Sequence, residues 1–445
     1  MQITRQIDRN ICIIGLGYVG LTLAVAMARA GFRVHGVEIN KSIVKTLRTK
    51  RAHFTEAGFD HALREQIEAG RLTFSTSMPP QHDYSTYIIT VGTPLDGENR
   101  SDTSSLAKVI QTLSSQIKDD DLVILRSTVT IGTTRKTFED LKEKTGIETR
   151  IAFCPERTIE GRALSELETL PQIIGGIDHD SFIRSKGIFN RITPNIVAVS
   201  NPETAEMIKL VNNTQRDLNF AFANEVALMA QACNLSASEV ISSANFEYPR
   251  SNLASPGPVG GPCLEKDPYI LAESLEKYKY VPALSLLARK VNSDLPFDIV
   301  SKINALFQER QKRRITRATI LGLAFKGRPA TNDMRGTMAI PLIEALRASN
   351  PAIEICGWDP VAEPSAVSNL NIDASTDLLQ ASRHSDLIVI QNNHPFFGQM
   401  DLNEIAEVMQ SGGIIYDFWS QHHGANRKLS NNAIYCALGE GKSGG

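Results

Sequence analysis

The stretch NICIIGLGYVG, residues 10–20, decides the fold of this 445-residue chain. Four of its first five residues are apolar and three of them are β-branched, as in a buried strand, and a glycine-rich turn follows. The apolar helical pattern LTLAVAMARAG (21–31) comes next, and FRVHGVE (32–38) has the character of a second strand. A strand, a short helix and a second strand form the repeating unit of a parallel sheet. The chain therefore begins with an α/β domain.

The glycine-rich turn predicts a dinucleotide site. Gly15 permits the tight turn, Gly17 lets the backbone approach a pyrophosphate, and Gly20 lets helix and strand pack closely, with Tyr18 and Val19 between them. The helix that follows would present its N–H groups to the phosphates. Glu38 lies about twenty residues after the turn, where a carboxylate accepts ribose hydroxyls and repels a 2′-phosphate. This pattern favours NAD over NADP, and a purely structural turn is the alternative.

The same alternation continues through the first part of the chain. Further buried strands are expected at TYIITV (86–91), DLVILRS (121–127) and RIAFC (150–154), with helices near 104–117 and 133–145. Ligands of open parallel sheets lie beyond the carboxyl ends of the strands. Thr93 and Pro94 follow one strand and Thr128 follows another, so we expect these residues at the cofactor site, unless they are ordinary turns.

The sequence pattern changes after residue 200. Residues 203–233 contain neither Gly nor Pro and predict a long helix, with Asn201 as its cap and Pro202 in its first turn. Such a helix, more than about 40 Å long, could bridge two domains or form a dimer interface. Helical pattern continues to about residue 310. We expect the basic run ERQKRR (309–314) to be a solvated linker.

A second α/β alternation follows the basic run. Its expected strands lie at 318–325, 353–359, 386–393 and 412–418. The predicted fold is α/β, with an N-terminal Rossmann domain, a central long-helix region and a C-terminal Rossmann-like domain. We place these domains at residues 1–200, 201–310 and 311–439, and we expect a disordered tail at 440–445.

Composition excludes several classes of function. The formal net charge of −2 gives no electrostatic reason to bind nucleic acid or an anionic membrane. The six cysteines form no C-x-x-C pair, which argues against a zinc site or a disulfide framework and fits a reducing compartment. We find no signal peptide and no run of roughly 18 apolar residues that could span a membrane. These features predict a cytoplasmic protein.

The segment PGPVGGPCLEKD (256–267) is the candidate for covalent chemistry. Glycine and proline hold the backbone around Cys263, and Lys266 and Asp267 follow directly. A nearby cation lowers the pKa of a thiol, and the thiolate is the nucleophile. The helical pattern that follows would place a helix N-terminus close by, which favours an anion. The alternative is a structural cysteine buried in a loop.

Several motifs together resemble the UDP-glucose/GDP-mannose dehydrogenase family, the nucleotide-sugar 6-dehydrogenases. They occur in the family's order over nearly the whole chain: GLGYVG (15–20), VGTP (91–94), STVTIGTT (127–134), CPERTIEG (154–161), KLVNN (209–213), GGPCLEKD (260–267) and GLAFKGRPATNDMR (322–335). The resemblance implies a four-electron oxidation of a sugar C6 alcohol by NAD. Cys263 would hold the aldehyde as a thiohemiacetal and then as a thioester, which water cleaves.

The resemblance also implies roles for the residues around Cys263. Lys209 and Asn213 lie four apart on one helix face and would stabilise the developing oxyanion. Asp267 would position water or take part in proton transfer. Thr128 would belong to the catalytic group as well as to the cofactor site. Glu160 would be the base of thioester hydrolysis and Glu156 its support, although a solvated surface pair is the alternative for both glutamates.

The remaining matches concern the ligands. By resemblance, Lys266 and Arg335 would lie near the cofactor, although an inter-domain ion pair is equally open for Arg335. Glu156, Arg157, Lys209, Asn213, Arg250, Gly260 and Lys326 would contact the nucleotide sugar. Arg250 and Lys326 could also be plain surface cations. In the family the arginine at position 250 reaches the neighbouring subunit's site, which implies a homodimer.

This sequence departs from the family at two places. Glu265 stands where the family has proline before the lysine, and the segment Asp417-Phe418-Trp419-Ser420 lacks an arginine that many members carry. The second departure puts one contact to the nucleotide diphosphate in doubt.

The substrate stays open between two branches of the family. The run YPRSNL (248–253) resembles the N-acetylhexosamine branch, which acts on UDP-N-acetylmannosamine or UDP-N-acetylglucosamine, and we favour that branch. GGPCLEKD is closer to the UDP-glucose branch, so UDP-glucose or another nucleotide glucose is the alternative. Two other classes are also open. One is a dehydrogenase of the 3-hydroxyacid or 6-phosphogluconate type, and the other is a non-catalytic nucleotide-binding protein.

Overall fold

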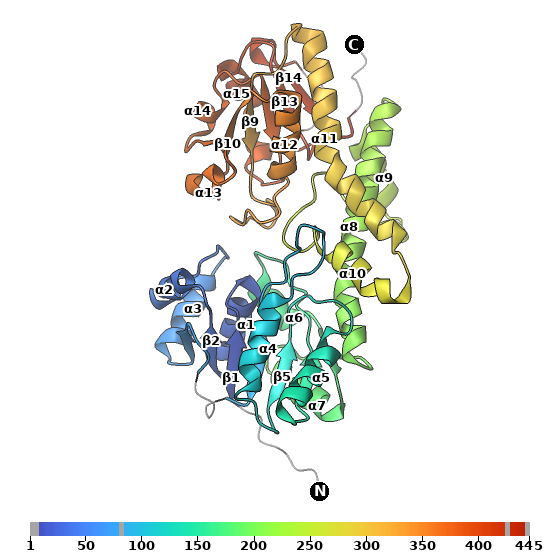
Figure 1. Ribbon diagram of the computed structural model, residues 1–445. Helices are drawn as coiled ribbons and strands as arrows, with labels where there is room; N and C mark the ends of the chain where they lie inside the picture. The colour runs from blue at the N-terminus through green and yellow to red at the C-terminus, as the bar shows by residue number, and fades with distance from the viewer. Residues whose placement is uncertain (1–8, 80–83, 423–427, 441–445) are drawn as a thin grey trace. The chain divides into compact units, whose positions relative to one another are not determined.

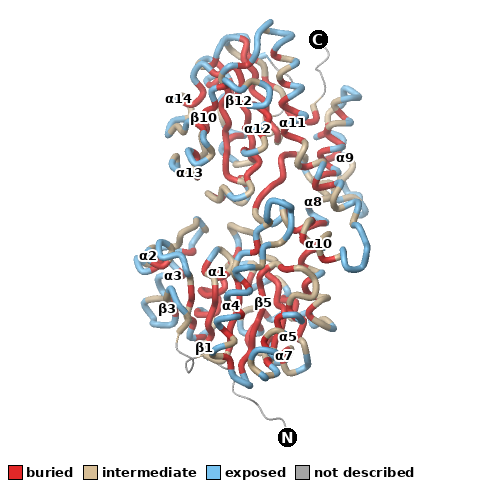
Figure 2. Tube along the Cα trace, in the orientation of Figure 1, coloured by how far each residue is buried: buried red, intermediate tan, exposed pale blue. Residues whose placement is uncertain are grey.

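The computed structural model describes residues 9–79, 84–422 and 428–440. The chain divides into two compact units. The N-terminal unit takes the chain up to Asn212 together with Tyr269–Pro282, and the C-terminal unit takes Asn213–Pro268 and the chain from Ala283 onward. Each unit contains one twisted sheet with helices packed against it (Figure 1), and the strands are the most buried parts of each (Figure 2).

The N-terminal sheet has eight strands in the order β3-β2-β1-β4-β5-β6-β7-β8. All neighbours are parallel except β6 and β7, which pair antiparallel. The strand order reverses between β1 and β4, which is where a doubly wound sheet binds its ligand. The strands span β1 Asn10–Ile14, β2 Arg33–Val37, β3 Leu72–Ser75, β4 Thr86–Ile89, β5 Leu122–Leu125, β6 Arg150–Phe153, β7 Gln172–Gly176 and β8 Ile196–Ala198.

Both faces of this sheet are covered, because the side chains of each strand alternate between two apolar clusters. In β1, Ile11 and Ile13 belong to the cluster that also contains residues of α1, whereas Cys12 and Ile14 belong to the cluster with residues of α4. This two-sided burial explains the continuous apolar strand sequences. The helices are α1 Tyr18–Arg29, α2 Lys41–Arg48, α3 Phe59–Glu68, α4 Ser104–Ser114, α5 Thr133–Thr145, α6 Ala163–Thr169 and α7 His179–Phe189.

The predicted long helix is α8, Pro202–Ala232, and Asn201 caps it by accepting a 2.8 Å hydrogen bond from the Thr204 N–H. The division between the two units falls inside this helix, after Asn212. The other helices of the middle region are α9 Ala237–Asn245, α10 Asp267–Leu275, the 3₁₀ turn η1 Glu276–Tyr278 and α11 Ala283–Gln311.

The basic run at 309–314 is solvent-exposed as predicted, with Gln311 half-buried, but its first half belongs to a helix and is not a linker. Residues 309–311 are the last residues of α11, and Arg310 donates a hydrogen bond to the Asn432 carbonyl. Arg313 forms an ion pair with Asp386, whose carboxylate is almost fully buried, at 2.5 Å. Arg310 and Arg313 are exposed to solvent, and their polar contacts also attach the end of α11 to the C-terminal α/β fold.

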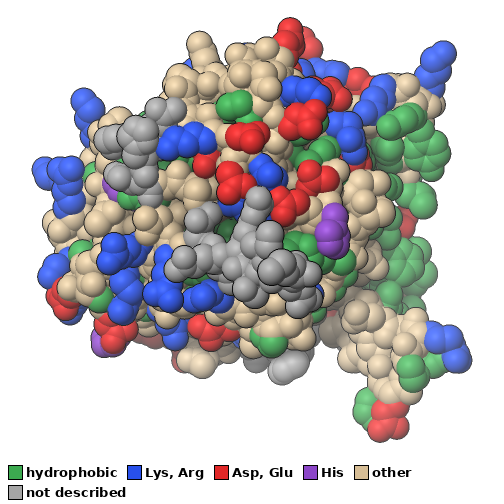
Figure 3. Space-filling model, turned by 90° about the horizontal axis from the view of Figure 1, so that it is seen from below, with side chains coloured by type: hydrophobic (Ala, Val, Ile, Leu, Met, Phe, Trp, Pro, Cys, Tyr) green, Lys and Arg blue, Asp and Glu red, His purple; other side chains and the backbone are tan. Residues whose placement is uncertain are grey.

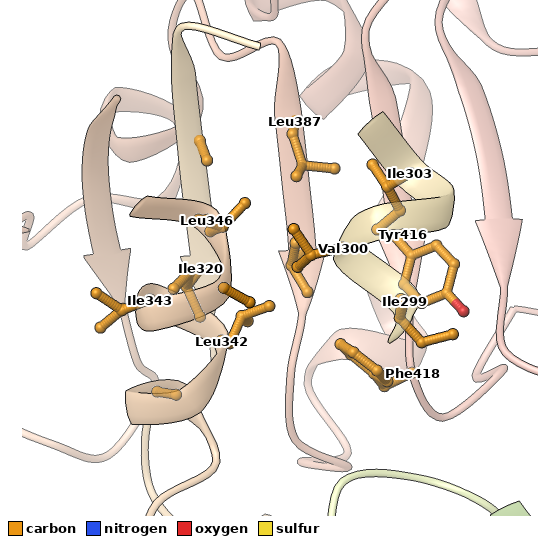
Figure 4. Packing of buried hydrophobic residues seen from close by; sticks show 14 of the residues in the cluster. Ile299, Val300, Ile303, Ile320, Leu342, Ile343, Leu346, Leu387, Tyr416 and Phe418 are labelled. Atoms are coloured by element: carbon orange, nitrogen blue, oxygen red, sulfur yellow. The ribbon is translucent and has the colours of Figure 1, made fainter. Parts of the chain in front are cut away.

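The C-terminal sheet has six parallel strands in the order β11-β10-β9-β12-β13-β14. Ile299, Val300 and Ile303 of α11 pack on this sheet beside Leu342 of α12 (Figure 4). The strands are β9 Arg317–Leu321, β10 Glu354–Trp358, β11 Asp373–Ala374, β12 Leu387–Ile390, β13 Ile414–Asp417 and β14 Ile434–Ala437, and the helices are α12 Ala339–Ser349, α13 Pro364–Ser368, α14 Leu378–Ser382 and α15 Leu402–Val408, with 3₁₀ turns η2 Phe397–Gln399 and η3 Ser430–Asn432.

Of the predicted tail, residues 441–445 lie outside the described residues. Glu440 is described, and it accepts hydrogen bonds from Ser236 and Ser238, each at 3.0 Å. Across the described ranges, no helix has both the length and the hydropathy needed to cross a lipid bilayer. The face shown in Figure 3 carries both acidic and basic side chains.

The two sheets begin in the same way. The Gly15 N–H donates to the Val37 carbonyl at 2.8 Å, and the Gly322 N–H donates to the Trp358 carbonyl at 2.9 Å. The next N–H in each unit, of Leu16 or Leu323, donates to the carboxylate that ends the second strand, Glu38 or Asp359. The C-terminal unit therefore repeats the turn that follows the first strand of the dinucleotide fold. Its first helix, α12, however, starts only after a loop at 322–338.

Candidate active site

Each glycine of the turn at 15–20 has its own steric reason. Gly15 has φ +93°, a conformation that favours glycine. A Cβ on Gly20 would lie 1.9 Å from the Gly15 carbonyl oxygen, so only glycine lets α1 approach the turn. A Cβ on Gly17 would meet nothing within 4 Å, and the first turn of α1 carries no acidic side chain. The open space and the positive helix end at Gly17 fit a pyrophosphate.

The strand ends around this turn are joined by short hydrogen bonds. Glu38 accepts the Leu16 N–H at 2.8 Å and the Asn40 N–H at 2.9 Å, and its carboxylate keeps lone pairs that could accept ribose hydroxyls. The Thr93 hydroxyl donates to the Thr128 carbonyl. Pro94, which follows Thr93, is exposed. The turn, Glu38 and the ends of β4 and β5 therefore occur together, as a dinucleotide site requires.

Tyr18 links this turn to the loop of Glu160, and no sequence pattern predicts that link. Its hydroxyl donates to the Glu56 carboxylate and accepts the Gly161 N–H at 2.9 Å. Glu56 also accepts the N–H groups of Gly161 and Leu164, both at 3.3 Å. Glu56 lies in an irregular segment without a periodic pattern, so only the folded chain reveals this contact. Val19 and Glu160 are half-buried.

Glu156 is 7% exposed, so the alternative of a solvated surface residue was wrong for it. Its carboxylate accepts from the Arg126 guanidinium at 2.5 Å and from the N–H groups of Arg157 and Thr158 at 2.7 Å. Burial opposes its ionisation, but Arg126, the Thr158 N–H and Lys209 outweigh burial and hold the pKa of Glu156 below its usual range. Glu156 therefore shapes the loop in which Arg157 donates to the Pro171 carbonyl.

Lys209 lies on α8 and is 8% exposed. Within the described part of the chain its ammonium group makes no hydrogen bond or ion pair, although it is close enough to Glu156 to lower the pKa of that carboxyl. A largely buried cation with no direct partner can bind an oxygen that acquires negative charge. This arrangement fits the predicted contact of Lys209 with the substrate.

One turn further along α8, Asn213 donates a 2.6 Å hydrogen bond to Asp267. Asp267 is fully buried at the start of α10, and its other carboxylate oxygen lies 3.4 Å from the Lys266 ammonium. The sequence had placed Asn213, Lys266 and Asp267 near one another, and these contacts bring them together.

Cys263 is exposed and lies in the turn that leads into α10. Its carbonyl accepts the N–H groups of Lys266 at 3.2 Å and Asp267 at 3.0 Å, which fixes its backbone. The thiol therefore lies close to the first turn of a helix, where the dipole favours a thiolate. This exposure contradicts the alternative of a buried structural cysteine.

The glycines before Cys263 are explained by close approach of the C-terminal loops. A Cβ on Gly257 would lie 2.6 Å from the Trp419 ring, one on Gly260 would lie 2.2 Å from the Gly336 carbonyl oxygen, and one on Gly261 would lie 2.4 Å from Phe325. The Gly261 N–H also donates to the Gly336 carbonyl at 2.7 Å. Gly260 thus has a packing role in addition to its predicted contact with substrate.

The two departures from the family lie at this same contact. Trp419, in the segment that lacks the arginine, packs on Gly257 and donates its indole N–H to the Gln391 carbonyl at 2.8 Å. The Glu265 carboxylate lies beside Gly336. Desolvation raises the pKa of Glu265, against the attraction of Arg289. Both substituted positions therefore face other parts of the C-terminal unit.

Three of the predicted ligand-binding cations, Lys326, Arg335 and Arg250, lie outside helices and strands in the C-terminal unit. Lys326 lies over the Phe325 ring, with its ammonium 5.3 Å from the ring centre. Arg335 pairs at 2.5 Å with Asp333 of the same loop. Arg250 is exposed, donates to the Tyr248 hydroxyl at 3.0 Å and covers that ring. Nothing in these contacts assigns Arg250 to a second subunit.

The site residues thus divide between the two units. The N-terminal unit holds the dinucleotide turn, Glu38, Thr93, Pro94, Thr128, Glu156, Arg157, Glu160 and Lys209, and the C-terminal unit holds Asn213, Arg250, Gly260, Cys263, Lys266, Asp267, Lys326 and Arg335.

A dinucleotide turn with an acidic second-strand end, combined with an exposed cysteine on a second α/β unit, defines an NAD-dependent oxidoreductase. The chain belongs to the UDP-glucose/GDP-mannose dehydrogenase family: its NAD-binding domain matches residues 9–193, its central domain 203–294 and its UDP-binding domain 319–423. NAD is therefore the cofactor, and the chain is a nucleotide-sugar dehydrogenase.

Individual relatives agree with this assignment. UDP-N-acetyl-D-mannosamine dehydrogenase of Pyrococcus horikoshii is 33% identical over 91% of this chain and 94% of its own. The solved structure of UDP-D-ManNAc dehydrogenase from P. horikoshii matches with a TM-score of 0.86 at 30% identity, covering 97% of this chain and 99% of that one. A UDP-glucose dehydrogenase from Pyrobaculum islandicum matches with a TM-score of 0.84 at 25% identity, covering 99% of both chains.

Proposed function

We propose that this protein oxidises the C6 alcohol of UDP-N-acetyl-D-mannosamine to the uronic acid, with Cys263 as covalent nucleophile. The observation that carries the proposal is the exposed Cys263 at the start of α10, next to the Asn213–Asp267 hydrogen bond. The relatives named for UDP-N-acetyl-D-mannosamine support this substrate over its N-acetylglucosamine epimer. The UDP-glucose dehydrogenase of similar fold keeps UDP-glucose as the second candidate.

The chain's residues fit a sequence of two oxidations. NAD, when bound, accepts one hydride in each oxidation. In the first, the C6 alcohol loses a hydride and its hydroxyl proton, and Lys209 and Asn213 stabilise the oxygen as charge develops. The Cys263 thiolate then adds to the aldehyde carbon, and the resulting thiohemiacetal is a far better hydride donor than the aldehyde.

The second oxidation converts the thiohemiacetal into a thioester. Water, deprotonated by Glu160, attacks the thioester carbon, and the C–S bond breaks to restore the Cys263 thiolate. One alcohol, two NAD and one water therefore give one carboxylate, two NADH and three protons. Asp267, held by Asn213, would orient the water, and Glu156 would hold the loop that carries Glu160.

The decisive experiment measures NADH absorbance with UDP-N-acetylmannosamine, UDP-N-acetylglucosamine, UDP-glucose and GDP-mannose. We expect two NADH per UDP-N-acetylmannosamine consumed and a lower kcat/KM for the other sugars. The variant Cys263→Ser should stop after the first oxidation, whereas Cys233→Ser, at the other exposed cysteine, should behave as wild type. One NADH per sugar would instead indicate a dehydrogenase of the 3-hydroxyacid type, and no NADH with any sugar would indicate a nucleotide-binding protein without this activity.

We further propose that the protein acts as a homodimer, with Arg250 completing the site of the second subunit. Phe222 and Met229 on α8 and Phe246 after α9 are large apolar side chains exposed by 47%, 49% and 75%. Apolar surface of this kind is typical of a subunit interface. Light scattering should give twice the chain mass. Mixing the inactive variants Arg250→Ala and Cys263→Ser should restore part of the activity, because a mixed dimer would contain one intact site; no recovery after subunit exchange would contradict a role in trans.

A further inference from the structure

One face of α8 continues the catalytic pattern beyond Asn213. Asp217 lies four residues after Asn213, and Asn224 lies seven residues after Asp217, which places all three side chains on the same side of the helix. All three are buried, and Asp217 and Asn224 are 0% exposed. Three buried polar side chains in line require partners, and in this protein the partners belong to the segment around Cys263 or lead to it.

Asn224 binds the start of that segment through both the oxygen and the NH₂ group of its side-chain amide. Its side-chain oxygen accepts the Gly257 N–H at 2.7 Å, and its NH₂ group donates to the Gly257 carbonyl at 3.1 Å. The same NH₂ group donates to Asn292 of α11 at 2.9 Å. Gly257 is therefore held by Asn224 and covered by the Trp419 ring, so both sides of the backbone are fixed at this position.

Arg289 of α11 holds the part of the segment that contains Cys263. Its guanidinium is 1% exposed and forms a 2.8 Å ion pair with Asp217. It also donates to the Val259 carbonyl at 2.9 Å and to the Leu264 carbonyl at 3.4 Å. These two carbonyls lie on either side of Cys263 in the sequence. Since a peptide group is planar, fixing a carbonyl fixes the direction of the following N–H as well.

A buried ion pair is weak evidence for stability, because well-packed apolar side chains of similar volume often serve as well or better. The planar fork of arginine can, however, bind a carboxylate and two carbonyls at defined angles, which a lysine cannot do. The geometry of the Arg289 contacts therefore suggests a role in fixing the nucleophile segment.

We propose that Arg289, anchored by Asp217, is a positioning residue that fixes the backbone on both sides of Cys263 in the reactive conformation. The proposal rests on the proposed role of Cys263 as nucleophile. Arg289 itself would contact neither the substrate nor the reacting atoms. Its effect on the reaction passes through the carbonyls of Val259 and Leu264.

The test uses the full-length enzyme carrying Cys233→Ser, so that Cys263 is the exposed thiol that reacts. Arg289→Lys keeps the charge beside Asp217 but loses the fork, and Asp217→Asn keeps the shape but loses the anchor. The matched control is Arg313→Lys, which alters an ion pair with Asp386 elsewhere in the C-terminal unit. Each variant is assayed for alkylation of Cys263 by iodoacetamide between pH 6 and 9, for turnover, for NAD affinity and for thermal unfolding.

We expect Arg289→Lys and Asp217→Asn to lower kcat by about 100-fold, the order of loss that a misplaced reacting group causes. Both should shift the pH profile of Cys263 alkylation, and both should bind NAD as the parent enzyme does. Arg313→Lys should change only the thermal unfolding. Unchanged kcat and an unchanged alkylation profile in Arg289→Lys would overturn the proposal. Loss of NAD affinity together with kcat would show a general folding defect and would overturn it too.

The alkylation measurement separates this proposal from the proposed function. It detects the conformation of the Cys263 segment in the absence of any sugar. If the wild-type protein oxidised no nucleotide sugar, the proposed function would fail while the alkylation profile could still be compared. If the wild-type protein formed two NADH per sugar and Arg289→Lys did the same at full rate, the positioning role alone would fail.

Discussion

At the scale of single residues, the glycines of the dinucleotide turn show how one motif combines different constraints. The structure requires glycine at position 20 to let α1 pack, whereas position 17 has open space and its constraint comes from the ligand. The folding requirement and the binding requirement can therefore be separated by substitution.

Gly17→Ala should leave the thermal unfolding temperature unchanged and weaken NAD binding, because the added methyl group occupies the space that the pyrophosphate needs. Gly20→Ala should destabilise the protein by about 1–3 kcal/mol, the usual cost of overpacking, because its methyl group meets the Gly15 carbonyl. Calorimetry of unfolding and of NAD binding would check both. A Gly17→Ala variant with normal NAD affinity would contradict the site as described.

Glu156→Gln should destabilise the protein by about 3–5 kcal/mol, because it leaves the buried Arg126 charge without its partner. The pKa of Glu156 is lowered in the folded state. Its contribution is therefore present above the unfolded pKa and disappears as pH falls through the folded pKa. The free energy of unfolding, measured with urea at pH 7 and at pH 4, should fall more between these two pH values in the wild type than in the Glu156→Gln variant.

The matched control for this prediction is Glu168→Gln. Glu168 forms an exposed ion pair with Arg29, so its loss should cost at most about 1 kcal/mol at pH 7. Equal effects of the two substitutions would refute the structural role assigned to Glu156.

Sequence reasoning could name residues that belong to motifs but not residues whose contacts depend on the fold. The glycines, Glu38, Lys209, Asn213 and Cys263 stand in recognisable patterns. Arg289 and Asn224 are ordinary members of helical segments, and only packing against the segment around Cys263 reveals their contacts. No spacing rule relates residues that meet across two helices and a loop, so these contacts could not be predicted.

At the scale of elements, α8 was predicted to within one residue at each end, because a long stretch without Gly or Pro and a recognisable cap define it locally. The basic run at the end of α11 is exposed, as its charge predicted. The sequence did not reveal that Arg313 pairs with the buried carboxylate of Asp386. Glu206 of α8 accepts the Thr134 N–H at 2.7 Å and the Gly132 N–H at 2.6 Å, which joins α8 to the start of α5.

Asn201→Ala should destabilise the N-terminal unit by about 1 kcal/mol, because the Thr204 N–H at the start of α8 would lose its acceptor. Asn201→Asp should be nearly neutral, since aspartate caps helices equally well. Chemical denaturation of the three proteins would measure the difference. A loss in Asn201→Asp equal to that in Asn201→Ala would contradict capping as the cause.

At the scale of the whole molecule, the sequence predicted two α/β parts and a helical middle, and that fold class is confirmed. The predicted boundaries at 200 and 310 remain a prediction. They follow changes of sequence pattern, whereas the compact units divide within α8 and return to the N-terminal unit for Tyr269–Pro282. The antiparallel pairing of β6 and β7 was not foreseen, because buried strands look alike in either direction.

NAD and UDP should each protect a different unit of the protein from amide hydrogen exchange. NAD alone should slow amide hydrogen exchange at residues 15–20 and 38–40, and UDP alone should slow it at 322–337 and 391–394, because ligands stabilise the part that binds them. Mass spectrometry of exchange with each ligand would check this. Protection by UDP confined to the N-terminal unit would contradict the UDP-binding assignment of residues 319–423.

The packing of Gly257, Gly260 and Gly261 against Trp419, Gly336 and Phe325 bears on the engineering of chimaeras. A chimaera could take only the chain after residue 311 from a relative, in order to change the nucleotide preference. It would then pack the glycines of this protein against the relative's side chains. Donor fragments should therefore include both the segment before Cys263 and the loops that touch it. A crossover point between these two parts of the chain would separate residues that pack tightly against one another.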